Sequence, residues 1–522
     1  MSASDSRVAL TAAPVRLEQL LAVVDGAPVR VSREALQLME ASREALDRAV
    51  ARGDAVYGVT TGVGHLRDQR LPPEVVHRMQ ARLLDMHAGA YGEPLRRDVV
   101  RAVMTARLVG LTRGGSGAAP RVAQALAGLL NADVVPVVPS TGSVGAGDLA
   151  EHSYVALVAT GRGQALVDGE VVGGDVALSR AGLEPLQLTG KDGLALISAN
   201  GVTLGTGALV LRRARRLLVV ADTVAGVSMD AFGANTSVLA SEVQTAKGLA
   251  GQAESAARLR RVLAGSPRSG AAVSVQDPIS FRVVPQVHGA YAEILDSAER
   301  AVTDELNARA DNPLASASTG QVLSNGNFHP VLVALAFESL RVALAHLVQL
   351  SERRTGQLWQ RAVTALTELP SGDPPTAPWW AAGLQLRYAA ASGWTRARSL
   401  VGPVTLDVPP LDFGQEDHST NAPAAVRCTQ EVLDIAHDVL AIELLNACAL
   451  LALSPEPAPG PRAADLVAAL GRELQGPPAS ADRVHERVRA VLPQLCAAGP
   501  TRGPAARGPV SARGGSLPPR GP

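Results

Sequence analysis

Apolar residues recur at spacings of three and four over long stretches of the chain. This pattern is typical of helices that pack on other helices. The clearest stretch is 330–354, which is apolar on almost every side and predicts a long helix in the centre of a bundle. We expect this helix to end at the charged segment 351–354 (SERR), and we expect two similar helices over 206–229 and 429–453.

Few segments have the alternation that indicates strands. Residues 28–32 predict a short strand before a helix capped by Ser32. Residues 166–172 predict a hairpin with Asp168 and Gly169 at its turn. The expected fold is therefore mainly α, with a long central helical bundle and a small N-terminal α+β head that contains the short strands.

The composition changes abruptly after Ser454, to proline, glycine, arginine and alanine. We divide the chain into an N-terminal region with glycine-rich loops (1–200), the central long-helix bundle (201–453), short C-terminal helices (454–497) and a tail (498–522). The short helices are expected at 463–474 and 481–495. The tail has too little apolar surface to fold, and we interpret it as a solvated segment.

The 49 basic and 49 acidic residues balance, so no net charge favours nucleic acid or an anionic membrane. The longest uncharged run, 194–211, contains polar residues, and we predict no transmembrane helix. The first 16 residues lack a basic segment followed by an apolar one, which predicts a cytoplasmic protein. Cys428, Cys448 and Cys496 are too far apart for a CxxC metal site, and we expect no metal.

Two glycine-rich segments are candidates for chemistry. In 57–64 (YGVTTGVG) a tyrosine lies beside three glycines, and a flexible loop of this kind can bring a phenol against a ligand for proton transfer. A surface turn is the alternative. Segment 140–150 (STGSVGAGDLA) is similar but lacks the lysine of a phosphate-binding loop.

Polar clusters beside apolar runs are the second group of candidates. Arg282, in QDPISFR, could hold a carboxylate with two hydrogen bonds, and Asn327 and Glu416 could orient an amine or a ring nitrogen. Each alone is more often a cap or a buried network. The chain has no zincin spacing and no G-x-S-x-G motif, which excludes those hydrolase classes.

Taken together and in order, these segments resemble the histidine and phenylalanine/tyrosine ammonia-lyases and the related aminomutases. The resemblance covers about residues 10–453. Its motifs are YGVTTGVG, QARLLDMHAGAYGEP, GSVGAGDLA, KDGLALI, QDPISFR, NFHP, SERR and QEDH.

The resemblance implies a bundle of the ammonia-lyase type, assembled as a homotetramer whose active sites are shared among subunits. It implies catalytic roles for Tyr57, Arg282 and Glu416. It also implies that a small-molecule substrate contacts a further set of side chains: Met86, His87, Ser198, Asn200, Asn327, Phe328 and Gln415.

The chain departs from this family at the segment that makes the family's electrophile, methylidene-imidazolone. That group forms from consecutive alanine, serine and glycine, whereas this chain has Gly145, Ala146, Gly147 and Asp148 with no serine between alanine and glycine. Ser143 cannot replace it, because the β-branched Val144 that follows hinders the tight turn. We therefore expect the prosthetic group not to form, and we expect no other cofactor.

Three further departures accompany this one. Ser198 occupies the position of an asparagine that assists the prosthetic group, unless Asn200 has shifted into its place. Ile279 occupies the position of a tyrosine, and residues 151–154 (EHSY) replace the family's proline-containing segment.

These departures leave three interpretations. The first is an enzyme of specialised metabolism that acts on an aromatic or heteroaromatic carboxylate through Tyr57, without the electrophile, by addition or elimination, isomerisation or cyclisation. The second is a conventional ammonia-lyase or aminomutase. The third is a catalytically silent scaffold.

Overall fold

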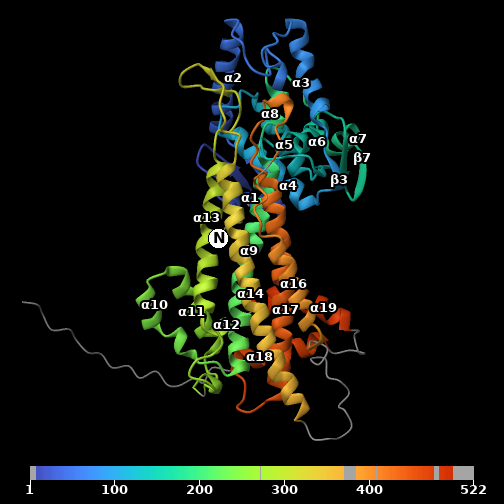
Figure 1. Cartoon of the computed structure of the whole chain (residues 1–522). Helices are drawn as coiled ribbons and strands as arrows, with labels where there is room; N and C mark the ends of the chain where they lie inside the picture. The colour runs from blue at the N-terminus through green and yellow to red at the C-terminus, as the bar shows by residue number, and fades with distance from the viewer. Residues whose placement is uncertain (1–6, 271, 369–383, 407, 475–480, 498–522) are drawn as a thin grey trace, which may run out of the picture.

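Four long helices run side by side through the computed structural model and form its central bundle (Figure 1). They are α9 (Gly201–Phe232), α13 (Val284–Leu306), α14 (Val331–Thr367) and α17 (Ala422–Leu453). The structure describes residues 7–270, 272–368, 384–406, 408–474 and 481–497. The predicted tail, 498–522, lies outside these residues.

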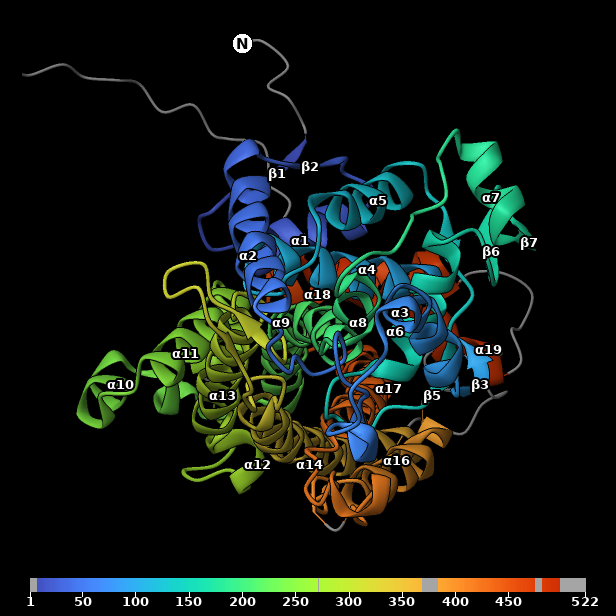
Figure 2. The same ribbon diagram turned by 90° about the horizontal axis from the view of Figure 1, so that it is seen from above.

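A head of shorter helices covers one end of the bundle (Figures 1 and 2). Its helices are α1 (Leu17–Val24), α2 (Arg33–Ala51), α3 (Pro73–His87), α4 (Arg97–Thr112), α5 (Pro120–Asn131), α6 (Leu149–Ala159), α7 (Gly174–Ala181) and α8 (Asp192–Ile197). Ser32 caps α2 as predicted, because its hydroxyl accepts a hydrogen bond from the Ala35 amide at 3.2 Å.

Short strands lie within and beside the head. β1 (Val8–Leu10) pairs in parallel with β2 (Val29–Val31). The other pairs are antiparallel: β3 (Tyr91–Pro94) with β5 (Pro139–Thr141), β6 (Gln164–Val167) with β4 (Val135–Pro136) and β7 (Glu170–Gly173), and β8 (Leu314–Ala315) with β9 (Val322–Leu323). The predicted hairpin is confirmed, since Asp168 and Gly169 connect β6 to β7.

The remaining helices flank the bundle. They are α10 (Ser241–Lys247), α11 (Ala250–Leu263), α12 (Ile279–Arg282), α16 (Arg387–Ser399), α18 (Pro461–Leu474) and α19 (Ala481–Ala497), with single 3₁₀ turns η1 (Gly64–Leu66), η2 (Thr236–Leu239), η3 (Pro267–Gly270) and η4 (Asp412–Gly414). α12 lies at the end of the bundle opposite the head (Figure 1). The mainly α fold with a small α+β head is therefore confirmed.

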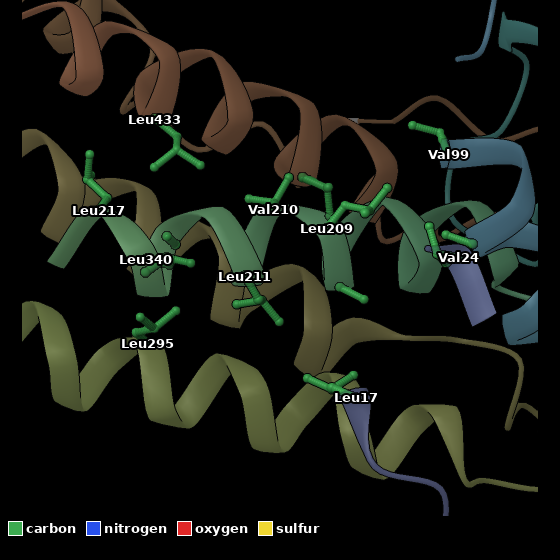
Figure 3. Close-up of a cluster of buried hydrophobic side chains, with 14 of the residues drawn as sticks. Leu17, Val24, Val99, Leu209, Val210, Leu211, Leu217, Leu295, Leu340 and Leu433 are labelled. Carbon is green, nitrogen blue, oxygen red and sulfur yellow. The ribbon is translucent and has the colours of Figure 1, made fainter. Parts of the chain in front are cut away.

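Leucine and valine side chains fill the spaces between the helices. Figure 3 shows Leu209, Val210, Leu211 and Leu217 of α9 among side chains from neighbouring helices, such as Leu295 of α13. Burial of each such side chain stabilises the fold by about 1.5–3 kcal/mol. The core is thus continuous from the head into the bundle.

The expected end of the longest helix is wrong. α14 continues past 351–354 to Thr367, because Ser351 and Arg354 point into the bundle and not into solvent. The buried Arg354 guanidinium forms an ion pair with the Glu443 carboxylate of α17, with Nε–Oε1 at 2.6 Å and Nη2–Oε2 at 2.9 Å. The Arg354 Nη1 also donates to the carbonyl of Ser280 in α12 at 3.2 Å.

Three helical stretches, Asp192–Phe232, α14 and α17, are long and apolar enough to span a membrane by length and composition. On those two criteria the three stretches qualify although the run 194–211 did not, and the absence of a transmembrane helix stays a prediction. The apolar windows of the first and third are 94% and 78% buried inside the protein, so packing in the bundle explains them. The window of α14 is 50% buried.

Candidate functional site

A pocket of about 380 Å³ lies in the head, where the tyrosine loop 57–64 meets α3 and the end of α8. Segments that are distant in sequence form its wall. Its lining includes Tyr57, Val63, Gly64, His65, Leu66, Met79, Met86, His87, Ala146, Leu149, Leu194, Ser198, Asn312, Phe328, Asp412 and Glu416.

The tyrosine loop is fixed by hydrogen bonds to the helices beneath it. The Gln80 side chain of α3 donates to the Gly58 carbonyl at 2.9 Å and accepts from the Leu194 amide of α8 at 3.1 Å. Gly58 has φ +67°, a conformation that glycine adopts without strain. The loop therefore directs Tyr57 into the pocket.

The Tyr57 hydroxyl accepts a hydrogen bond from the Gly64 amide at 2.9 Å. Burial raises the pKa of Tyr57 above its usual value; the carboxylates of Glu416 and Asp412 raise it further, while the Gly64 amide opposes the shift. Tyr57 is consequently a protonated phenol at neutral pH in this arrangement. Proton transfer by Tyr57 stays a prediction, and a protonated phenol would act in it as the donor.

His87 and Glu416 both line the pocket. The Nδ1 of His87 lies 2.8 Å from the Leu83 carbonyl, which accepts its proton and leaves Nε2 as the acceptor. Burial raises the pKa of Glu416, with a further contribution from Asp412, and His87 opposes the shift. Met86 lines the pocket beside them.

Of the glycine loop 145–148, only Ala146 lines the pocket. Gly145 and Gly147 have φ +80° and +76°, and the Thr420 hydroxyl donates to the Gly145 carbonyl at 2.7 Å. Asp148 is fully buried and accepts from the Ser143 hydroxyl at 2.6 Å and from the Thr203 amide at 2.9 Å. Burial raises the pKa of Asp148.

The segment 151–154, which departs from the family pattern, contributes buried polar side chains next to this loop. Glu151 is buried, its Oε1 accepts from the Ser143 amide at 3.0 Å, and its Oε2 has no partner among the described residues. Burial and Asp148 raise the pKa of Glu151 to about 7. Burial, with the nearby Arg107, lowers the pKa of His152 to about 3.

The side chains of Ser198 and Asn200 have different surroundings. Ser198 lines the pocket, whereas the Asn200 amide points away from it and donates to the Glu305 carboxylate at 2.8 Å. The structure therefore brings Ser198, and not Asn200, to the pocket.

Of the remaining predicted substrate-binding residues, one lines the pocket and two do not. Phe328 lines the pocket, while the amide of its neighbour Asn327 donates to the Arg309 carbonyl at 3.3 Å. Gln415 is exposed at the end of η4 and is not among the lining residues.

Arg282 does not reach this pocket within one chain. It ends α12, at the opposite end of the bundle from the head (Figure 1), and its Nε donates to the Asp277 carbonyl at 2.9 Å. Ile279, beside it, is exposed. If Arg282 acts on the pocket ligand, it does so from another copy of the chain.

Three polar residues of the pocket lining were not predicted as site residues from the sequence: His65, Asn312 and Asp412. The Nδ1 of His65 lies 2.7 Å from Asp412 Oδ1, and the His65 amide donates to Asp412 Oδ2 at 2.8 Å. His65 directly follows the motif YGVTTGVG, and Asp412 lies three residues before the motif QEDH. Only their positions next to these motifs could have indicated them.

Most of the chain resembles known proteins in sequence and in fold. The model of the aromatic amino acid lyase family matches residues 15–472. The chain is 38% identical to a histidine ammonia-lyase of Gloeobacter violaceus over 449 residues, 85% of this chain and 87% of that protein.

Solved structures show the same fold. The tyrosine aminomutase of Streptomyces globisporus superimposes with a TM-score of 0.84 at 28% identity, covering 94% of this chain and 97% of that one. Histidine ammonia-lyase from Trypanosoma cruzi gives 0.81 at 28% identity, covering 94% and 93%. An ergothionase from Treponema denticola gives 0.87 at 24% identity, covering 94% and 99%, a likeness of fold alone.

A long helical bundle, capped by a head whose glycine-rich loops enclose a tyrosine, defines the class of helical-bundle lyases. Within that class, the chain belongs to the aromatic amino acid lyase family.

The residues of the glycine loop do not fit methylidene-imidazolone. Gly145, Ala146 and Gly147 are consecutive and carry no hydroxyl to eliminate. The nearest serine in sequence, Ser143, donates its hydroxyl to the buried Asp148 and accepts there from the Gly145 amide at 3.0 Å. Its hydroxyl is thereby held within the loop and does not line the pocket.

Proposed function

We propose that this chain is an enzyme that acts on an aromatic or heteroaromatic carboxylate by proton transfer from Tyr57, without methylidene-imidazolone. The observation that carries the proposal is the pocket itself. Tyr57, His87, Phe328 and Glu416 line it, while the glycine loop 145–148, which contributes Ala146 to the lining, has no serine. A silent scaffold would not need a phenol, an imidazole and a carboxyl group around one cavity.

The absence of the electrophile limits which substrates the pocket can convert. The proton beside the ring of an aromatic amino acid is weakly acidic, and a tyrosine alone is a poor means of removing it. The substrate therefore has a more acidic C–H bond or an α,β-unsaturated carboxylate. Addition or elimination, isomerisation or cyclisation in specialised metabolism are the reactions that suit such a substrate.

The ligand's ring is expected between His87 and Glu416, which offer a hydrogen-bond acceptor and a carboxyl group to a ring nitrogen or hydroxyl. Its carboxylate is expected on Arg282 of a second subunit in a homotetramer. The half-buried apolar window of α14, with Leu332 and Leu335 exposed, supports such an assembly. The enzyme is proposed to work in the cytoplasm.

The intact mass of the purified protein tests the absence of the prosthetic group. We expect the mass encoded by the gene, no additional near-ultraviolet absorption and negligible ammonia release from L-histidine, L-phenylalanine or L-tyrosine. A mass lower by two waters, together with ammonia release, would show a conventional lyase and overturn the proposal.

Replacing Arg282 by lysine tests the carboxylate subsite. A guanidinium binds a carboxylate with two parallel hydrogen bonds that an ammonium group cannot reproduce. We expect Arg282→Lys to weaken the binding of imidazole-4-acrylate, cinnamate or 4-hydroxycinnamate at least tenfold by calorimetry, about 1.4 kcal/mol.

The matched control is Arg216→Lys, on an exposed position of α9, which should leave the affinity unchanged. Equal affinities of the Arg282 variant and the wild type would show that Arg282 is structural.

A further inference from the structure

His65 and Asp412 form an imidazole–carboxylate pair on the wall of the pocket. Asp412 accepts twice from the same residue, at Oδ2 from the His65 amide (2.8 Å) and at Oδ1 from Nδ1 (2.7 Å). A carboxylate can only accept, so Nδ1 carries the ring proton and Nε2 keeps its lone pair. The His65 side chain is 47% exposed, and its printed partner among the described residues is Asp412 on Nδ1, so Nε2 is open to a ligand.

The backbone conformations at Gly64 and at Asp412–Phe413 permit this contact. A Cβ added at Gly64, which has φ +56°, would lie 2.0 Å from Asp412 Oδ2, so only glycine allows the carboxylate to approach. Asp412 and Phe413 both have positive φ, +45° and +55°. Non-glycine residues rarely adopt this conformation, and such strain is typically found at functional sites.

The Phe413 ring completes the arrangement. It packs edge-on against the His65 ring, with centroids 5.0 Å apart. Contacts on Nδ1 and on the ring face thus fix the imidazole in one orientation at the pocket wall.

We propose that His65, oriented by Asp412, is a second proton-transfer residue of this pocket and acts as the general base. The proposal rests on the proposed function, since it requires a ligand in the same cavity. A phenol held in its protonated form supplies protons, and a pocket that also removes a proton from carbon needs an acceptor. An imidazole with a carboxylate on its far nitrogen is suited to that role.

The step balances within the protein and its ligand. A C–H bond beside the ligand's ring or carboxylate breaks, its electron pair stays on the ligand, and the proton forms a bond to Nε2. Asp412 stabilises the imidazolium. Tyr57 donates its proton to a different ligand atom, which gives an isomer, and the phenolate then regains a proton from the imidazolium. No oxidant or other reactant is consumed.

Deuterium exchange tests the base without knowledge of the natural substrate. The full-length protein is incubated in D₂O with imidazol-4-ylpyruvate, phenylpyruvate or 4-hydroxyphenylpyruvate, whose C–H bonds between the ring and the keto group are acidic enough for the proposed reaction. Carbon-bound deuterium above the rate without protein is followed by mass spectrometry. We expect the wild type to exchange at least one of these probes. His65→Asn should lower the rate on the order of a hundredfold or more, with affinity within threefold.

Asparagine is the informative substitution because its amide can still donate to Asp412 and hold the loop, but it cannot take a proton. The matched control is His346→Asn, on an exposed position of α14, which should exchange at the wild-type rate.

Asp412 is a positioning residue in this scheme, and its substitution has a separate signature. Asp412→Asn should slow exchange about tenfold at unchanged affinity. It should also shift the ¹⁵N resonances of His65 away from the Nδ1–H tautomer. A purely structural role would alter neither the tautomer nor the ratio of rate to affinity.

The outcomes separate the two proposals. Exchange at the full rate in His65→Asn, with loss in Tyr57→Phe, would overturn the role of His65 and leave the proposed function intact. A wild type that exchanges no probe would overturn both. Loss of exchange in His65→Asn with retained affinity supports the base.

Discussion

Replacing Tyr57 by phenylalanine is expected to lower turnover of the pocket's substrate on the order of a hundredfold or more, with ligand affinity within a few fold. The substitution keeps the ring in its loop and removes only the hydroxyl, which accepts one hydrogen bond, from Gly64. Packing should therefore survive, and the loss should fall on the chemical step. Steady-state kinetics and calorimetry on the same preparation measure the two quantities.

The raised pKa of Tyr57 predicts how the activity changes with pH. Because burial and the carboxylates of Glu416 and Asp412 raise the pKa of Tyr57, its proton-donating form persists above the usual range of tyrosine. Activity that depends on the phenol should fall only at strongly alkaline pH. Full activity of Tyr57→Phe would remove this residue from the mechanism.

The second large effect is expected on stability, from Glu443→Gln in the centre of the bundle. Glu443 and Arg354 are both fully buried, and the carboxylate also accepts from the hydroxyls of Ser228 at 2.7 Å and Ser351 at 2.5 Å. Glutamine leaves the Arg354 charge unpaired. Breaking a buried pair from one side typically costs about 3–5 kcal/mol.

The measurement is the midpoint of denaturant unfolding, compared at equal protein concentration. Glu431→Gln is the matched control, because its partner Arg396 and Glu431 itself are 59% and 44% exposed. A surface pair of this kind contributes at most about 1 kcal/mol. Equal midpoints for the two variants would contradict the assignment of Glu443 to the stability of the bundle.

The same ion pair shows where prediction from the sequence failed. The apolar spacing over 330–354 correctly predicted a long central helix, but charges usually mark solvent, so the helix was expected to end at them. Arg354 is instead neutralised by a residue 89 positions away. No local pattern could have revealed a partner at that separation.

The pocket, too, could be predicted from the sequence only in part. Tyr57, His87 and Glu416 lie in motifs that the sequence shares with its family, and their meeting in one cavity could be anticipated from that resemblance. The contact between His65 and Asp412 spans 347 positions and belongs to no motif. It depends on how the turn 411–416 folds against the tyrosine loop, which only the three-dimensional structure defines.

The distance between α12 and the head within one chain has a genetic consequence. If Arg282 serves the pocket of another copy, two defective alleles can complement each other. Chains that carry Tyr57→Phe and chains that carry an Arg282 substitution would each be inactive alone. Mixed assemblies would contain some cavities with an intact tyrosine from one parent and an intact arginine from the other, and a cell expressing both alleles would recover part of the wild-type phenotype.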